Sequence, residues 1–305
     1  MTNSHLRNIA ASVHQRILNK SRESARPFND LLQYYAIERF LYRLSRSSYA
    51  GKFILKGALM LMVWEVRAFR STMDIDMLGK MKNSTDTIIA MVRDVCRQEV
   101  EPDGIVFDPD SIHGQMITED ADYEGVRINF RGSLDTARIS IQLDVGFGDI
   151  VIPSPELMAY PTILDLPAPQ IRGYSKESMI AEKFEAMVRR GIMNSRMKDF
   201  WDIRLLSRQF DFDGQTLAAA ITETFTARHT VIPSDPVAFT EAFIRDEAKQ
   251  SQWKAFLRKN RMTGAQDTFE EAVNAVSLFL KPVVDGLVNS KSVPATWKAP
   301  GPWHK

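Results

Sequence analysis

The sequence predicts an α+β fold with two N-terminal helices, a small core built on a mixed sheet, and a helical C-terminal domain. Three observations predict this class. Apolar residues recur at helical spacing over 6–24 and 28–46, apolar and polar residues alternate around Ile75 and over 122–151, and helical patterns dominate from about Tyr174. Strands and helices are thus mixed in the middle of the chain, whereas its two ends are helical.

The N-terminal segment, residues 1–46, is predicted to form a pair of helices. Its second helix contains FNDLLQYYAIERFLYRL, in which Leu31, Phe40 and Leu44 belong to one apolar face. The predicted core, residues 47–155, begins with the β-rich run GKFILKGAL and the alternating run RSTMDIDMLGK. It continues with a helix in STDTIIAMVRDVCRQEV and ends with two alternating strands.

A proline cluster between Ile152 and Pro169 marks the predicted end of the core, because proline interrupts both helices and central strands. The helical domain is predicted over residues 170–290. Its periodic segments are SKESMIAEKFEAMVRRG, RMKDFWDIRLLSRQF, DGQTLAAAITETF, DPVAFTEAFIRDEAKQSQWKAFLRK and DTFEEAVNAVSLFLKPVVDGL. Residues 291–305 are predicted to form a loosely structured tail.

The composition is that of an ordinary globular protein. The 305 residues are 44% hydrophobic and 25% charged, and 39 Lys+Arg against 38 Asp+Glu give a net charge of +1. Contact with nucleic acid would therefore depend on a local basic patch. The single cysteine, Cys96, excludes an internal disulfide, and no run suits a secretory signal or a membrane helix, so we expect a cytoplasmic protein. The histidines lack zinc-ligand spacing.

Asp74 and Asp76 raise the main chemical question, because they bracket Ile75 in an otherwise apolar run. Successive side chains of a strand point to opposite faces, so the two carboxylates share one face, about 7 Å apart. A divalent cation would compensate their charge, and Mg²⁺ suits carboxylates that leave room for phosphate oxygens. Asp144, on the polar face of ISIQLDV, would complete a three-acid metal site if its strand neighbours the first. The alternative is a solvated strand end without a metal.

Gly57 in LKGAL is a candidate for phosphate binding. Glycine lets the backbone approach a phosphate closely, and the N-terminus of a following helix offers N–H groups to an anion. The order of elements supports this interpretation: a strand, then Lys56 and Gly57, then a helix expected over 59–66, then RSTMDID. A glycine alone would be a weak signal, but its place in this order favours a nucleotide site.

Two motifs together resemble a known family. LKGALML…RSTMDIDML resembles the nucleotidyltransferase core of the AbiEii/AbiGii toxin family, whose members show K-G-G and then R-x-[ST]-x-D-[IL]-D. AEKFEAMVRRG…RMKDFWDIRLL is similar to the family's downstream block A-x-K-x-x-A-x-x-x-R…K-D-x-x-D. The resemblance covers about 30–210 and implies a polymerase-β-like nucleotidyltransferase core with a helical partner domain. Ala58 departs from the usual second glycine, so Ser71 and Thr72 are possible substitutes in the phosphate contact.

Lys183 stands out in the downstream motif because it lies on the apolar face of its helix, with Ile180 and Met187. A lysine on that face needs an anion unless its stem snorkels to water, and the anion could be an internal carboxylate or a triphosphate. Asp199 and Asp202, one turn apart, could pair with Lys183, bind metal or position an acceptor, or serve only as caps or surface groups. Following the resemblance, we assign Lys183 to catalysis and the two acids to nucleotide binding.

The resemblance implies a Mg²⁺-dependent nucleotidyltransferase that moves a nucleoside monophosphate from an NTP to an acceptor hydroxyl. The residues assigned to metal are Asp74, Asp76 and Asp144, and those assigned to the phosphates are Lys56, Gly57, Ser71 and Thr72. The protein would be the toxin of a type IV toxin–antitoxin or abortive-infection system that blocks growth, with tRNA as acceptor and a cognate antitoxin as partner.

Two other functions stay open at this point. A metal-dependent nuclease could use the same three acids, and a non-catalytic nucleic-acid-binding protein could share the fold. The basic runs Arg189–Lys198 and Lys254–Arg261 could follow an RNA backbone, or they could be solvated helix faces.

Overall fold

The computed structural model describes residues 3–67, 70–118, 124–262, 268–289 and 291–304. By their contacts the residues form two units. The sheet unit comprises Met1–Trp64, Thr72–Gly148 and Glu156–Gly173, and the helical unit comprises Glu65–Ser71, Asp149–Pro155 and Tyr174–Lys305. The predicted boundaries divide the chain in sequence order, whereas contacts group segments from several parts of it.

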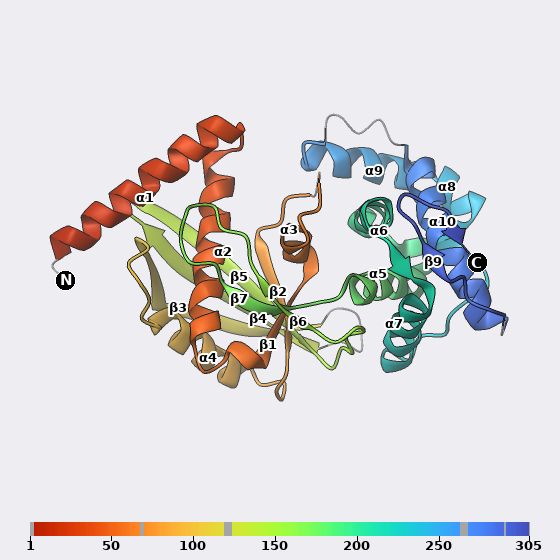
Figure 1. The fold of residues 1–305 in the computed structure, drawn as a ribbon, viewed down its shortest axis with the longest axis horizontal. Coiled ribbons are helices and arrows are strands. Elements are labelled where there is room, and N and C mark those ends of the chain that lie inside the picture. The colour runs from red at the N-terminus through yellow and green to blue at the C-terminus, as the bar shows by residue number, and fades with distance from the viewer. Residues whose placement is uncertain (1–2, 68–69, 119–123, 263–267, 290, 305) are drawn as a thin grey trace. The chain divides into compact units, whose positions relative to one another are not determined.

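A seven-stranded mixed sheet forms the centre of the sheet unit, in the order β3-β4-β5-β2-β1-β7-β6 (Figure 1). The strands are β1 (Phe53–Lys56), β2 (Asp74–Gly79), β3 (Ile105–Thr118), β4 (Glu124–Leu134), β5 (Ala137–Phe147), β6 (Glu156–Ala159) and β7 (Gln170–Gly173). The pairs β2–β5 and β1–β7 are parallel and the others are antiparallel. The predicted α+β class with a mixed sheet is confirmed.

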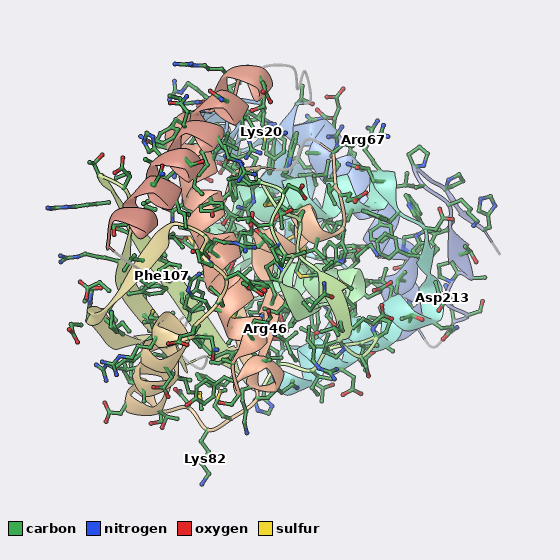
Figure 2. The ribbon with its side chains drawn as sticks, turned by 60° about the vertical axis from the view of Figure 1, so that its left-hand side comes forward. Lys20, Arg46, Arg67, Lys82, Phe107 and Asp213 are labelled. Atoms are coloured by element: carbon green, nitrogen blue, oxygen red, sulfur yellow. The ribbon has the colours of Figure 1, made fainter. Side chains whose placement is uncertain are left out.

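Helices cover one face of this sheet. They are α1 (Asn3–Ser24), α2 (Phe28–Arg46) and α4 (Thr85–Arg97), whereas the short α3 (Met60–Val63) follows the turn after β1. The predicted N-terminal pair is present, and α2 crosses the sheet in Figure 1. Phe40 of α2 packs on Phe107 and Phe130, with ring centroids 5.9 and 4.9 Å away, and Phe107 is labelled in Figure 2. The opposite face of the sheet carries the polar side chains of the candidate site.

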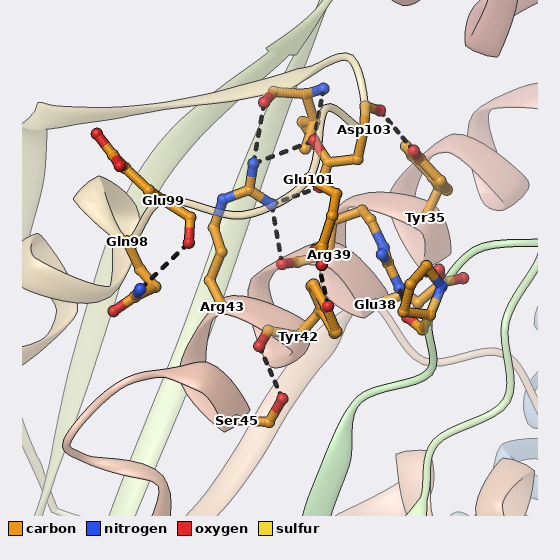
Figure 3. A network of polar contacts seen from close by, with 12 residues as sticks. Tyr35, Glu38, Arg39, Tyr42, Arg43, Ser45, Gln98, Glu99, Glu101 and Asp103 are labelled. Carbon is orange, nitrogen blue, oxygen red and sulfur yellow. Dashed lines mark hydrogen bonds and ion pairs between the residues drawn. The ribbon is translucent and has the colours of Figure 1, made fainter.

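Charged residues on the buried side of α2 hold the loop before β3 (Figure 3). Arg43 donates two hydrogen bonds, of 2.6 and 3.0 Å, to the carboxylate of Asp103, and both side chains are buried. The Tyr35 hydroxyl donates to the Asp103 carbonyl oxygen at 2.6 Å. Beside them, Arg39 pairs with Glu38 at 2.8 Å. Buried charges are costly unless paired, so these contacts fix the position of α2 relative to the sheet.

The helical unit contains the helices predicted from the sequence. They are α5 (Lys176–Arg190), α6 (Met197–Gln209), α7 (Gly214–Ala227), α8 (Glu241–Arg245), α9 (Glu247–Lys259) and α10 (Phe269–Val288). Side-chain caps define several of their N-termini. Asp213, labelled in Figure 2, accepts from the Thr216 N–H at the start of α7, and Thr268 and Glu271 form a capping box at α10. None of the helices in the described ranges is long and apolar enough to cross a membrane.

The C-terminal residues are ordered into structure where the sequence predicts a loose tail. Strands β9 (Thr296–Trp297) and β10 (Trp303–His304) join β8 (Phe212–Asp213) in a second, three-stranded sheet. Trp297 is buried and its indole donates to the Ser207 carbonyl oxygen at 2.6 Å. Trp303 stacks on Phe279 with centroids 5.6 Å apart. Two-residue strands have no detectable periodicity, and the packing of the Trp297 and Trp303 side chains orders this segment.

Candidate active site

The strand register places two of the predicted acids side by side. β2 and β5 run parallel as neighbours, with Asp76 opposite Asp144 and Asp74 opposite Gln142. Residues opposite each other on paired strands project from the same face of the sheet. The strand of Asp144 therefore neighbours the strand of Asp74 and Asp76, as the predicted site requires.

The pair of acids lies within a row of four charged residues that crosses four strands. Lys56 of β1 is opposite Asp76, and Arg127 of β4 is opposite Asp144. The Arg127 guanidinium donates to both oxygens of Asp144, at 2.8 and 2.7 Å. Gln142 donates to the same carboxylate at 3.3 Å. Across the row the charges are positive, negative, negative and positive. Asp144 is held by charge-assisted, bidentate contacts.

Gly57 sits directly against Asp76. It has φ of +69°, in the left-handed region that favours glycine, and it follows β1 at the start of a short turn into α3. A Cβ atom built at this position would lie 2.0 Å from Oδ2 of Asp76. The absence of a side chain at Gly57 is thus what lets the Asp76 carboxylate occupy its place beside the Lys56–Gly57 turn.

This contact gives a direct prediction. Gly57→Ala should displace the Asp76 carboxylate and strain the backbone, and we expect nucleotidyl transfer to fall by roughly 10²-fold, the scale for misplacing a reacting group by about 1 Å. Gly51→Ala is the matched control, because a Cβ at Gly51 meets nothing within 4 Å. Steady-state transfer rates measure both variants. Equal activity of Gly57→Ala and the control would remove Gly57 from the site.

A small hollow adjoins the acids on the same face. Its volume is about 50 Å³. Its lining residues are Lys56, Asp76, Asp144, Val145, Gly146, Gly125 and Ile117. The two glycines, on neighbouring strands, leave the sheet without side-chain cover immediately beside the paired carboxylates.

The three predicted metal ligands are not gathered into one cluster. In the described part of the chain, no group of three or more His, Cys, Asp or Glu side chains is placed to hold a metal ion. Asp144 is engaged by Arg127, and Asp74 is exposed at the end of its strand. The donor chemistry nevertheless fits a hard divalent cation, because Asp76 and Asp144 offer carboxylate oxygens from adjacent strands.

The other predicted phosphate ligands are differently placed. Ser71 is exposed, and its contacts assign it to the helical unit. Thr72 belongs to the sheet unit. The Thr72 backbone N–H donates to the Tyr34 hydroxyl at 3.1 Å, so Tyr34 of α2 positions the chain two residues before Asp74. Ala58, the departure from the family pattern, is buried.

A second charged cluster lies inside the helical unit, around Lys183 of α5. The Lys183 ammonium contacts Asp199 and Asp202 of α6, each at 2.8 Å. Arg196 pairs with Asp199 at 2.8 Å, and Arg70 pairs with Asp202 at 3.1 Å. The anion that the sequence requires for Lys183 is thus present within the protein. Sequence reasoning missed Arg70, although it is the first residue of the RSTMDID motif.

The electrostatics of this cluster keep all its members charged. Burial acts to lower the pKa of Lys183, but Asp199 and Asp202 outweigh it and the pKa is raised. Burial acts to raise the pKa of Asp199, but Lys183 and Arg196 outweigh it and the pKa is lowered. The pKa of Asp202 is lowered likewise, against its burial, by Arg70 and Lys183. The cluster is a largely buried ion network in which each carboxylate contacts two cations.

The two basic runs differ in how their charges are used. In the first, Arg189 pairs with Glu185 at 3.4 Å and Arg196 pairs with Asp199. In the second, at the end of α9, the side chains of Lys254, Arg258, Lys259 and Arg261 are exposed. The second run is therefore the better candidate for contact with an RNA backbone.

A mixed sheet with paired strand carboxylates beside a Lys–Gly turn is the arrangement expected of a polymerase-β-like nucleotidyltransferase. The family model described as nucleotidyl transferase AbiEii toxin, type IV TA system, matches residues 39–275. The chain belongs to this AbiEii family and is a nucleotidyltransferase, as the sequence predicted. Membership of a type IV toxin–antitoxin family implies a nucleotide substrate and a cognate antitoxin.

Two solved structures share the fold. A candidate nucleotidyltransferase from H. pylori aligns over 86% of this chain and 97% of its own, with a TM-score of 0.50 and 14% identity. JHP933 from Helicobacter pylori aligns over 86% of this chain and 94% of its own, also with a TM-score of 0.50 and 14% identity. No curated protein matches the sequence. At this identity the likeness concerns the fold alone.

Proposed function

We propose that this nucleotidyltransferase moves a nucleoside monophosphate from an NTP to a hydroxyl group of RNA, with tRNA as the acceptor and pyrophosphate as the second product. The observation that carries the proposal is the in-register pair Asp76–Asp144 beside the Lys56–Gly57 turn. A metal-bound triphosphate calls for a cationic group, N–H donors and carboxylate oxygens, and Lys56, the turn at Gly57 and the Asp76–Asp144 pair would supply them.

The proposed metal ligands are Asp74, Asp76 and Asp144, and the proposed metal is Mg²⁺. When bound, it would supply stabilisation of negative charge on the attacking and leaving oxygens. We assign Asp144 to the acceptor side, where its carboxylate favours loss of the hydroxyl proton. The other residues of the site would position the nucleotide and the acceptor, because phosphoryl transfer depends mainly on alignment and charge compensation.

The proposed phosphate ligands include Lys56, Gly57, Ser71 and Thr72. Lys56 would neutralise phosphate charge, and the backbone N–H groups of the turn that begins at Gly57 would donate to phosphate oxygens. The position of Gly57 against Asp76 supports this assignment, because it puts the turn next to a proposed metal ligand. The hydroxyl groups of Ser71 and Thr72 would replace the contact of the second glycine.

We include Lys183, Asp199 and Asp202 because they match the family motif. Lys183 would neutralise charge on the nucleotide, and the two acids would hold its ammonium group in position. In this role a phosphate must compete with two carboxylates for Lys183, since the ammonium group lies 2.8 Å from each of them. A measurement of NTP affinity on folded Lys183 variants tests it.

The proposal has a cellular consequence. Modification of the acceptor hydroxyl of tRNA would block growth until a cognate antitoxin prevents it. The exposed basic side chains at the end of α9 support an RNA acceptor, since the net charge of the whole chain is only +1 and RNA can be favoured only at a local patch.

Labelled nucleotides test the proposal. We expect label from the α-phosphate of an NTP to appear in RNA, and label from the γ-phosphate to appear only in pyrophosphate. Incubation of the protein with Mg²⁺, total tRNA and each labelled NTP, followed by denaturing electrophoresis, measures both. Shortened RNA without label would indicate a nuclease, and label on a protein side chain would leave the transferase but replace the acceptor. Neither transfer nor cleavage would indicate a binding protein.

A further inference from the structure

We propose that Arg127 occupies the oxygen atoms of Asp144 in the nucleotide-free protein, so that the site takes up a divalent cation together with the nucleotide rather than alone. The inference rests on the metal ligands in the proposed function and adds a residue that governs their occupancy. In this role Arg127 is a positioning residue, because it acts through Asp144.

The geometry of the contact supports this role. Arg127 uses Nε and Nη2 to reach separate oxygens of Asp144, at 2.8 and 2.7 Å. A bidentate guanidinium–carboxylate pair occupies the oxygens through which a carboxylate binds a metal ion. Asp144 can therefore bind either Arg127 in this geometry or a metal ion with the same oxygens, and binding of one opposes binding of the other.

The charge of the site supports the same conclusion. Lys56 and Arg127 balance Asp76 and Asp144 within the row, and Asp74 adds one further negative charge on the same face. Counted over these five side chains alone, a lone divalent cation would change the net charge from negative to positive, which is unfavourable in a partly buried setting. A triphosphate that enters with the cation makes the net charge negative again. It also attracts the guanidinium released from Asp144, because two N–H groups of a guanidinium can donate together to phosphate oxygens.

Neighbouring side chains permit the exchange. The Arg127 side chain is 35% exposed, so it can leave Asp144 without breaking core packing. Gln142 also donates to Asp144, at 3.3 Å, in a contact that does not involve Arg127. Asp144 itself, at 19% exposed, is held by its strand in register with Asp76. The backbone geometry of the acids therefore does not depend on Arg127.

Manganese binding tests the proposal without an activity assay. Mn²⁺ is titrated into the full chain and free Mn²⁺ is followed by electron paramagnetic resonance, first without nucleotide and then with a non-hydrolysable NTP analogue. Without nucleotide, we expect Arg127→Gln to bind Mn²⁺ at least roughly tenfold more tightly than the wild type, since it loses the competing cation. With the analogue, we expect the affinity of the wild type to rise more than that of the variant.

The control is Arg131→Gln. Arg131 lies on the same strand and face, is exposed, and is opposite Ser140 on β5 and Asp108 on β3 rather than a proposed metal ligand. It should bind Mn²⁺ as the wild type does. Arg127→Lys, which keeps the charge and loses the fork, should fall between wild type and Arg127→Gln, and it provides a second variant if Arg127→Gln unfolds.

The outcomes separate this inference from the function on which it rests. Equal Mn²⁺ affinity of wild type, Arg127→Lys and Arg127→Gln without nucleotide would overturn the role of Arg127 and leave the metal assignment intact. A gain in affinity that persists in Arg127→Gln/Asp144→Asn would also overturn it, because the gain must come through Asp144. Failure of every form to bind Mn²⁺, even with the NTP analogue, would overturn the metal site itself.

Discussion

Replacement of Asp76 by asparagine is expected to abolish nucleotidyl transfer while the fold is retained. Asp76 lies between Lys56 and Asp144 in the strand register and against Gly57, so its carboxylate is at the centre of the proposed site. Loss of a metal ligand removes stabilisation worth several kcal/mol, so we expect the rate to fall by roughly 10³-fold or more. Transfer of α-labelled nucleotide to RNA measures the rate.

The same variant should be about as stable as the wild type without metal. Loss of the Asp76 charge removes repulsion from the neighbouring acids together with attraction to Lys56, so the melting temperature in EDTA should change little. Asp110→Asn provides the control, because Asp110 is an exposed acid on the edge strand β3. Full activity of Asp76→Asn, with the control also active, would refute the metal assignment.

Replacement of Lys183 by methionine is expected to destabilise the helical unit strongly. The variant keeps the side-chain volume but leaves Asp199 and Asp202, both buried, without their shared cation. Removing one partner of a buried ion pair costs up to about 3–5 kcal/mol, and the loss here should lie at or below that range because Arg196 still pairs with Asp199 and Arg70 with Asp202. Urea unfolding measures the loss, and Lys254→Met, at an exposed position on α9, should change the free energy of unfolding little.

The pH dependence of this loss gives an independent check. Lys183 helps to lower the pKa of Asp199 and Asp202 below the ordinary value of 3.8, so the ion pairs contribute stability that is fully present above about that pH. This contribution disappears as the pH falls through the lowered pKa values. The difference in stability between wild type and Lys183→Met should therefore be full at neutral pH and shrink in acid below pH 3.8. Unchanged stability of the variant at neutral pH, with weakened NTP affinity, would show that Lys183 acts on the nucleotide alone.

The sequence predicts much of the fold because its central elements have clear periodicity. The alternation in β2 and β5 and the helical spacing of α2 and α5 correspond to elements in the structure. Strand β3 escaped prediction, since Pro109 and a break in register between Asp108 and His113 interrupt its pattern. Strands β6 and β7 lie within or beside the proline cluster and have only four residues each, which is too few for a periodic signal.

The candidate site is predictable only in part, for a related reason. Alternation places Asp74, Asp76 and Asp144 on polar faces, but it does not identify which strands become neighbours. The contact of Arg127 with Asp144 and that of Arg70 with Asp202 depend on this three-dimensional arrangement. Signals for both arginines were present: Arg127 occupies a polar position of the alternating strand GVRINF, and Arg70 begins the motif that contains the first two acids.

The central claim is that this chain adds a nucleoside monophosphate to tRNA through the acids of its sheet. Mass spectrometry of intact tRNA after incubation with Mg²⁺ and each NTP in turn tests it most directly, with Asp76→Asn in parallel. We predict that wild-type protein with at least one NTP increases the mass of tRNA by one or more nucleotide residues, and that Asp76→Asn does not. Unchanged tRNA mass with every NTP, or the same mass increase with Asp76→Asn, would contradict the account.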